Sequence, residues 1–353
     1  MNTIISQTKS VSLPIVCLVM AALVSSFARA EPVQSVSSFV RGFVQPGFTQ
    51  FSQDAQALAS SLDELCRSPS SAALKAAQNR FRGSSLSWSR IELVQLGPLS
   101  ENNAKERILF WPDRRGRGLR QVQALLAKQD PSVLSQQDLQ RKSVAVQGLG
   151  ALEYILFGAG SDALIERRSA HRCGFGRAIA RSVSATANSV LKDWNNEDGF
   201  TDSWVNPKPD AVRFRTRREA ESALLSTLSN ALSLVVKTRV MPLSSSNPRA
   251  ALFWRSQMSI RSLRSNLQGI EEQLGATGFL KRLSGPAFDL DRSITFEFKN
   301  ADRMLQKLEN AENRSKADLE YLAIVVQSLE GLVADRLAAA LGLPTGFSPT
   351  DGD

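Results

Sequence analysis

The sequence predicts an all-α protein built as two tandem antiparallel helical bundles, and three observations support this prediction. Leu, Ala, Ser, Gln, Arg and Glu are abundant while aromatic residues make up only 7% of the chain, a composition that favours helices. Apolar residues recur at alternating spacings of three and four, as on the buried face of a helix. No segment shows the two-residue alternation between hairpin turns that β-strands require.

The 353 residues are enough for one large or two medium domains. The best boundary lies at 195–210, where Asn-Asn, Asp-Gly, Asn-Pro and Lys-Pro pairs occur without a helical period. We therefore expect an N-terminal bundle over 31–195, a C-terminal bundle over 210–343 and a flexible tail over 344–353.

The clearest helix of the first bundle has a stripe of apolar residues along one face, and the helix ends at Ser68-Pro69-Ser70. The members of the stripe are Phe48, Phe51, Ala55, Leu58, Leu62 and Leu65. Further helices are expected at 71–87 or beyond, from 119 to about 130, at 137–157 and at 162–194, with a loop at 97–118. In the second bundle we expect helices at 214–240, 249–274, 289–312 and 315–342. The last of these has its own stripe of apolar residues, Leu319, Leu322, Val326, Leu329, Val333 and Leu337.

The first thirty residues predict a cleavable signal peptide and therefore a periplasmic protein. Lys9 supplies positive charge, residues 13–24 form a short apolar core, and Ala28-Arg29-Ala30 is a cleavage pattern. Lipid attachment at Cys17 is the alternative, which the preceding Pro-Ile-Val does not favour. No later segment is apolar enough to cross a membrane.

The chain without its signal peptide has two cysteines, Cys66 and Cys173. An oxidising compartment favours a disulfide between them, with two free buried thiols as the alternative. Closing a loop of roughly 100 residues would stabilise the fold by roughly 4–5 kcal/mol in the chain-entropy model.

The formal net charge is +9, but nucleic acid is excluded as a partner because the chain is exported and has no groove-reading motif. Scattered arginine clusters indicate solvated helix faces, except around 114–120, where an anionic ligand is the sharper interpretation.

One predicted helix contains two glycines followed by a lone acid, Gly148, Gly150 and Glu153. Each interior glycine costs about 1 kcal/mol relative to alanine, and an unpartnered buried carboxylate costs several more. Because Gly150 leaves one face bare, a backbone, a ring or a ligand can approach there, and Glu153 points into the same space. These features indicate a site.

The same residues resemble the imelysin family of imelysin-like peptidases and iron-regulated periplasmic proteins. Gly148-Leu149-Gly150-Ala151-Leu152-Glu153 falls where the family has Gly-x-His-x-x-Glu, with Gly150 in place of the histidine. Matching flanks cover most of the chain after its first thirty residues. They are Arg90-Ile91-Glu92, Gly97-Pro98-Leu99, Trp111-Pro112-Asp113, Leu119-Arg120-Gln121-Val122, Phe253-Trp254-Arg255-Ser256 and Leu263-Arg264-Ser265-Asn266-Leu267. The resemblance implies two bundle-like halves.

The candidate site combines the motif with the loop before it and the downstream match, and no catalytic residue is assigned. Its candidate ligand-binding residues are Trp111, Asp113, Arg115, Arg120, Gln147, Gly148, Gly150, Glu153, Trp254, Arg255 and Asn266. Glu153 and Asp113 are the candidate metal ligands. In the alternative, Glu153 is a buried acid paired with Arg115 or Arg120, and Trp254 belongs to the core. The single histidine, His171, lies among arginines and is expected to be a packing or surface residue.

These observations favour an exported, non-enzymatic protein that binds a small ligand or a metal-linked partner between its two halves. Resemblance to iron-regulated members implies a role in iron uptake, with periplasmic or membrane uptake components as partners and iron as the candidate cofactor. One alternative is an M75-type metallopeptidase, but hydrolysis needs about three metal ligands and a base, and Gly150 removes the motif histidine. The other is a partner-docking protein without a small-molecule site.

Overall fold

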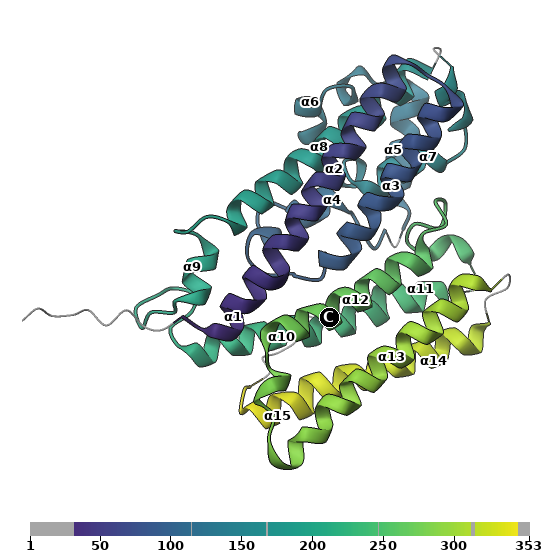
Figure 1. The fold of residues 1–353 in the computed structure, drawn as a ribbon. Coiled ribbons are helices and arrows are strands. Elements are labelled where there is room, and N and C mark those ends of the chain that lie inside the picture. Colours follow the sequence, from purple (N-terminus) through teal and green to yellow (C-terminus); the bar gives the residue numbers. More distant parts are fainter. Residues whose placement is uncertain (1–31, 114, 167–168, 246, 312–314, 345–353) are drawn as a thin grey trace, which may run out of the picture. The chain divides into compact units, whose positions relative to one another are not determined.

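Every regular element that the structure describes is a helix. The computed structural model describes residues 32–344 apart from 114, 167–168, 246 and 312–314, and this part of the chain contains no strand (Figure 1). The prediction of an all-α fold is confirmed. The signal peptide expected over 1–30 and the tail beyond 344 lie outside the described residues.

The N-terminal half, which we define as residues 32–195, is organised around two long helices, α2 and α8, that pack along each other, with α3 beside α2 (Figure 1). All six residues of the apolar stripe expected on α2 are fully buried. The helices are α1 (Gln34–Phe39), a π-helical turn η1 (Val40–Val44), α2 (Gln45–Arg67), α3 (Ser71–Ile91), α4 (Ala104–Ile108), α5 (Arg117–Lys128), α6 (Gln136–Gln140), α7 (Leu149–Phe157) and α8 (Ala170–Trp194).

The helix expected over 137–157 is interrupted, so that part of the prediction was wrong. After α6 the chain forms a short 3-10 turn, η4 (Val144–Val146), and α7 begins only after Gly148. Ser143 accepts a hydrogen bond from the N–H of Ala145 and so caps the short turn. The spacing of apolar residues continues across this break, because the break is created by local capping and not by a change in the apolar pattern.

The C-terminal half, residues 210–343, is a second group of helices in which α10, α12, α13 and α14 pack on one another (Figure 1). The helices are α10 (Arg217–Val235), the π-helical turn η7 (Val236–Val240), α11 (Met241–Leu243), α12 (Ser259–Thr277), α13 (Phe288–Asn310), α14 (Lys316–Gly331), the π-helical turn η11 (Leu332–Leu337) and α15 (Ala338–Leu341). Among the described helices none is long and apolar enough to cross a membrane.

The helix expected over 249–274 begins ten residues late, at Ser259. Residues 251–258, which we call the Ser256 turn, form turns in which Phe253 and Gln257 have φ of 56° and 61°. A positive φ cannot continue a right-handed helix. Trp254 and Arg255 therefore lie in a turn and not, as expected, on the same helix as Asn266.

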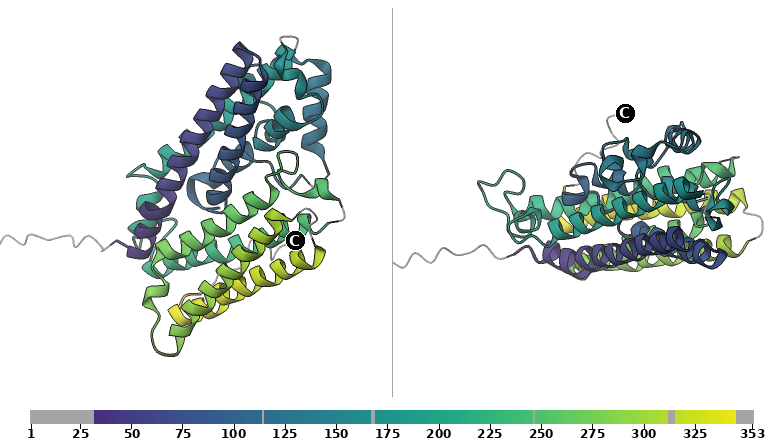
Figure 2. Two further views of the ribbon diagram at one scale, coloured as in Figure 1. Left: turned by 45° about the vertical axis from the view of Figure 1, so that its right-hand side comes forward. Right: turned by 90° about the horizontal axis from the view of Figure 1, so that it is seen from above.

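The two halves meet where α12 packs on α3 and where α1 contacts α10 and α12 (Figure 2). A Cβ on Gly269 of α12 would lie 2.1 Å from the carbonyl oxygen of Arg90, so only glycine allows this approach of the two backbones. The segment 195–210 contains one short helix, α9 (Phe200–Val205). The division into two bundles at this segment stays a prediction.

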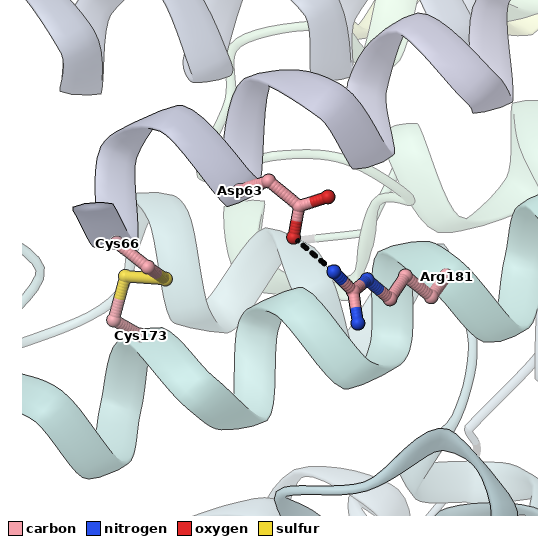
Figure 3. Close-up of a disulfide and its surroundings, with 4 residues drawn as sticks. All are labelled: Asp63, Cys66, Cys173 and Arg181. Carbon is pink, nitrogen blue, oxygen red and sulfur yellow. Dashed lines mark hydrogen bonds and ion pairs between the residues drawn. A yellow bond between two sulfur atoms is a disulfide. The ribbon is translucent and has the colours of Figure 1, made fainter. Parts of the chain in front are cut away.

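A disulfide joins Cys66, at the end of α2, to Cys173, near the start of α8, with 5.6 Å between their Cα atoms (Figure 3). The same pair of helices is linked further along by an ion pair between Asp63 and Arg181, 2.8 Å apart. The predicted disulfide is confirmed, and it covalently encloses the segment that contains α7.

Candidate functional site

The motif glycines lie at the beginning of α7 and have different roles. Gly148 is the residue before the helix, and a Cβ there would lie 2.6 Å from the carbonyl oxygen of Ile108, so this position excludes any side chain. At Gly150 the nearest atom to such a Cβ is Leu109 Cδ1, at 3.9 Å, an ordinary contact. The close approach expected at Gly150 therefore occurs at Gly148.

Glu153 points away from solvent and toward the C-terminal half. Its side chain is buried, with 4% exposed, and Oε1 accepts hydrogen bonds from the backbone N–H and the hydroxyl of Ser256, at 2.9 and 2.7 Å. The alternative in which Glu153 pairs with Arg115 or Arg120 was wrong. The carboxylate instead connects α7 to the Ser256 turn. It thereby crosses the interface between the N-terminal and C-terminal halves, which we call the seam.

The burial of Glu153 has an electrostatic cost that its partners do not remove. Burial raises the pKa of Glu153 above its ordinary value of 4.5, while the two Ser256 hydrogen bonds and the nearby charge of Arg255 lower it. The net shift is upward, because loss of solvation penalises the charged form more than these contacts favour it. Burial therefore favours the protonated form of Glu153 more than it would for an exposed glutamate.

Beside Glu153, three arginines alternate with two aromatic rings in what we call the Arg–aromatic stack. The Arg255 guanidinium lies 4.4 Å from the centroid of the Trp254 ring and 5.3 Å from that of Tyr154. Arg249 covers Trp254 at 5.6 Å, and Arg172 covers Tyr154 at 5.5 Å. Because Tyr154 and Arg172 belong to the N-terminal half and the others to the C-terminal half, the stack also spans the seam.

The cations of the stack are not equivalent. Arg172 donates hydrogen bonds to the carbonyl oxygens of Tyr154, Ile155 and Ala159, and so closes the end of α7. Arg255 has no hydrogen-bond acceptor or ion-pair partner among the described side chains. Burial lowers its pKa, while the charge of Glu153 raises it. Arg255 is thus half-buried yet available to an anion.

The residues of the preceding loop, which were expected to share the candidate site with Glu153, contact other groups. Trp111, which precedes a cis peptide bond to Pro112, donates from Nε1 to the carbonyl oxygen of Thr238, at 3.0 Å. Asp113 accepts from the backbone N–H groups of the first turn of α5, at 2.8 to 3.3 Å, and so acts as its cap. Arg120 donates to the carbonyl oxygen of Arg115, at 2.7 Å.

Gln147 is also a structural connection. Its side chain is fully buried, accepts a hydrogen bond from Arg107 at 2.8 Å and donates to the carbonyl oxygen of Lys142 at 2.7 Å. Both ends of the amide are satisfied, so in this structure Gln147 holds the segment before α7 in place.

A second polar cluster crosses the seam around Glu92, which follows α3. Its carboxylate pairs with Arg239 at 2.7 Å, with side-chain exposures of 3% and 7%, and accepts from Asn266 Nδ2 at 2.8 Å. The Oδ1 of Asn266 and the Nε of Arg239 have no hydrogen-bond partner within the described chain. Burial lowers the pKa of Lys105, with the charge of Glu92 opposing the shift.

Sequence reasoning missed Glu92, Arg239, Ser256 and Tyr154 as site residues. Glu92 and Ser256 lie inside segments that match the family, so the family match could have indicated both residues. Arg239 could have been noticed as a charge within the apolar stretch before Pro242. Asn266 joins the Glu92 cluster and not the Glu153 group.

The donor set does not fit a resident iron ion. Glu153 and Asp113, the predicted metal ligands, are engaged by Ser256 and by the start of α5. Among the described residues there is no group of three or more His, Cys, Asp or Glu side chains placed to hold a metal. A tightly bound divalent or trivalent ion needs about that many protein donors.

The all-helical fold and the Gly-x-Gly-x-x-Glu segment at the seam place the protein in the imelysin-like structural class. The sequence profile of imelysin, peptidase M75, matches residues 44–335. The chain therefore belongs to the imelysin family.

Three proteins that are similar to this chain illustrate the resemblance. The chain is 21% identical over 260 residues to the iron-regulated protein A of Synechococcus elongatus, covering 72% of this chain and 68% of the relative. The crystal structure of an imelysin-like protein from Psychrobacter arcticum has a similar fold, with a TM-score of 0.70, 16% identity and coverage of 89% of this chain and 97% of the other. The crystal structure of a putative iron-regulated protein A precursor from Parabacteroides distasonis has a TM-score of 0.67 and 14% identity. The match covers 87% of this chain and 96% of the other.

Proposed function

We propose that this protein is an exported, non-enzymatic binding protein that assists iron uptake, and that its ligand is an anionic, aromatic iron complex such as haem. The observation that supports the proposal is the placement of a buried carboxylate, Glu153, beside the Arg–aromatic stack at the seam. The link to iron comes from the relatives, two of which carry the name iron-regulated protein A.

The chemistry of the stack favours a planar anion over a bare metal ion. Trp254 and Tyr154 are half-buried and already covered by guanidinium groups, so a planar ligand stacks on either ring by displacing a guanidinium group from it. Arg255 offers a cation without an acceptor, which suits a carboxylate of the ligand. Burial raises the pKa of Glu153 and so favours its neutral form, which repels an anionic ligand less than a carboxylate does.

Peptidase chemistry has little support in this geometry. Gly150 stands in the position of the motif histidine, and the single histidine of the chain, His171, contacts the carbonyl oxygen of Asp130 through Nε2 at 2.9 Å. The Glu153 carboxylate is hydrogen-bonded to Ser256, so the helix presents neither a second metal ligand nor a positioned base.

The proposal is tested by thermal unfolding with haem and with ferrous, ferric and zinc ions. We expect haem to raise the Tm, since a ligand at 100 times its Kd stabilises by about 2.7 kcal/mol, and we expect the bare ions to have no effect. Replacing Arg255 with Gln should weaken haem binding about tenfold. Glu153→Ala should also weaken it.

Arg177→Gln is the matched control, because Arg177 lies on α8 outside the stack. The proposal is wrong if no iron species raises the Tm and Glu153→Ala is neutral. It is also wrong if the control weakens haem binding as much as Arg255→Gln. A peptide-library digest in which cleavage is abolished by Glu153→Ala would instead support the peptidase.

A further inference from the structure

A long groove lies on the seam at a separate place from the Arg–aromatic stack. Its walls are α1, η1 and the start of α2 on one side, α3 and α12 along the floor, and the first turn of α10 with residues 278–282 at one end. Its volume is about 1640 Å³, which exceeds the roughly 300–1,000 Å³ of an ordinary small-molecule pocket. The groove is therefore dimensioned for an elongated ligand.

The length of the groove can be read along one helix. Arg41 and Asp54 line it at two places on the continuous helix formed by α1, η1 and α2, and they are about 20 Å apart at 1.5 Å per residue. An extended peptide advances about 3.3 Å per residue. The groove thus accommodates an extended segment of about six residues.

Two glycines on its walls have no packing explanation. Gly83 on α3 and Gly275 on α12 both line the groove, and a Cβ added to either would meet no atom within 4 Å. In contrast, a Cβ at Gly47 would lie 2.5 Å from Ile91 Cγ2, so packing accounts for that glycine. Helix-interior glycine is unfavourable relative to alanine, and at Gly83 and Gly275 its visible effect is to leave the groove open.

The lining of the groove mixes apolar, polar and charged side chains. Among the apolar lining residues, Phe43 on the η1 side and Ile91 on α3 are buried. Phe43 also belongs to the π-helical turn η1, and π-helical turns often occur at functional positions.

The rim carries an excess of available positive charge. Two pairs are already formed, Arg90 with Glu272 and Arg282 with Glu221. Within the described part of the chain, three lining cations have no ion-pair or hydrogen-bond partner for their side chains, and one lining carboxylate, that of Asp54, has none. The three cations are Arg41, Arg217 and Lys281.

We propose that this groove binds an extended acidic peptide segment of a partner protein. Its carboxylates pair with Arg41, Arg217 and Lys281, and its backbone passes Gly83 and Gly275. This partner site is separate from the one proposed for the iron complex, and Glu153→Gln leaves it intact.

The test is fluorescence anisotropy with a labelled nine-residue peptide of alternating Glu and Ser. We expect saturable binding that weakens as salt is added, and no binding of the matched Lys and Ser peptide. Combined alanine substitution of Arg41, Arg217 and Lys281 should weaken binding about tenfold or more, since three exposed pairs are lost. Gly83→Trp and, separately, Gly275→Trp should abolish it by filling the groove.

Gly83→Ala adds a single methyl group to the groove wall, so it should weaken binding much less than Gly83→Trp and retain most of it. Lys192→Ala, an exposed lysine on α8 outside the groove, should also retain binding. The proposal is overturned if both folded tryptophan variants bind normally, if the Lys peptide binds equally well, or if Lys192→Ala weakens binding as much as the triple variant. Binding of inorganic polyphosphate that competes with the peptide but persists in both tryptophan variants would likewise overturn it.

Discussion

Glu153 brings a titratable group into the seam under conditions that disfavour its charge. Because burial raises its pKa in the folded protein above the ordinary 4.5, the native state holds this proton more tightly than the unfolded state does. Its contribution to stability is therefore fully present below about pH 4.5 and is lost as pH rises through the raised folded pKa. Above that pH the buried charge remains a cost.

Replacing Glu153 with Gln tests this account. The amide keeps an oxygen that can accept from Ser256 but removes the charge. We expect the variant to match the wild type near pH 4 and to be more stable by about 1 kcal/mol near pH 7.5, measured by urea unfolding at both pH values. Glu153→Ala should be less stable at both, because the Ser256 donors lose their acceptor. A Gln variant that is less stable than the wild type at pH 7.5 would contradict the cost of the buried charge.

At the scale of single residues, the sequence identified Glu153 as a buried acid but not its partner. The glycine-and-acid pattern and the family resemblance both pointed to it. Its hydrogen bonds come from Ser256, about one hundred positions away along the chain, and no local pattern records such a pairing. The same reason explains why Arg239 was not expected to meet Glu92.

The disulfide acts at the scale of elements, by holding the end of α2 to the start of α8. The closed loop has a sequence separation of 107, and the chain-entropy model gives roughly 4–5 kcal/mol for a loop of that length. The two helices also pack along each other, so their association does not depend on the covalent bond alone.

Removing the disulfide should therefore destabilise the protein without abolishing its helices. For the variant with both Cys66→Ser and Cys173→Ser, we expect a loss of at most about 4–5 kcal/mol in urea unfolding and an unchanged far-ultraviolet circular dichroism spectrum. The reduced wild type is the control and should behave like the double variant. Equal stability of oxidised and reduced wild type would show that the bond does not constrain the unfolded chain.

Periodicity predicted long helices well and their interruptions poorly. In α2 and in the continuous stretch formed by α14 and η11, the apolar residues expected from spacing are buried, because burial of one face is what creates the pattern. The late start of α12 depends on positive φ at Phe253 and Gln257, and neither residue type indicates such a turn. The break before α7 depends on caps and on contact with Ile108, which spacing does not reveal.

On the scale of the whole molecule, the Glu92 cluster connects the two halves through buried charges. Arg239 and Asn266 from the C-terminal half both contact a carboxylate from the N-terminal half. Such a pair is costly to break one residue at a time, because the remaining charge stays buried without a partner. Replacing both charged residues together lowers the stability much less, because no charge is left buried without a partner.

A double-mutant cycle on this pair tests the coupling between the halves. Arg239→Met and Glu92→Gln should each destabilise the protein, the first by about 3–5 kcal/mol. The double variant should lose less than the sum of the two, measured by urea unfolding. Arg213→Met, which removes an exposed pair with Glu101, is the control and should cost less than about 1 kcal/mol. Strict additivity of the two buried substitutions would contradict the coupling.

The position of the Cys66–Cys173 bond also determines how a cleaved molecule behaves. Arg141, whose side chain is 82% exposed, lies between the two cysteines, so a single tryptic cut after it leaves both fragments on one covalent species. Such nicked material migrates as two bands on a gel only after a reductant is added. Digests of this protein therefore have to be compared with and without reduction before an uncut band is taken as resistance to trypsin.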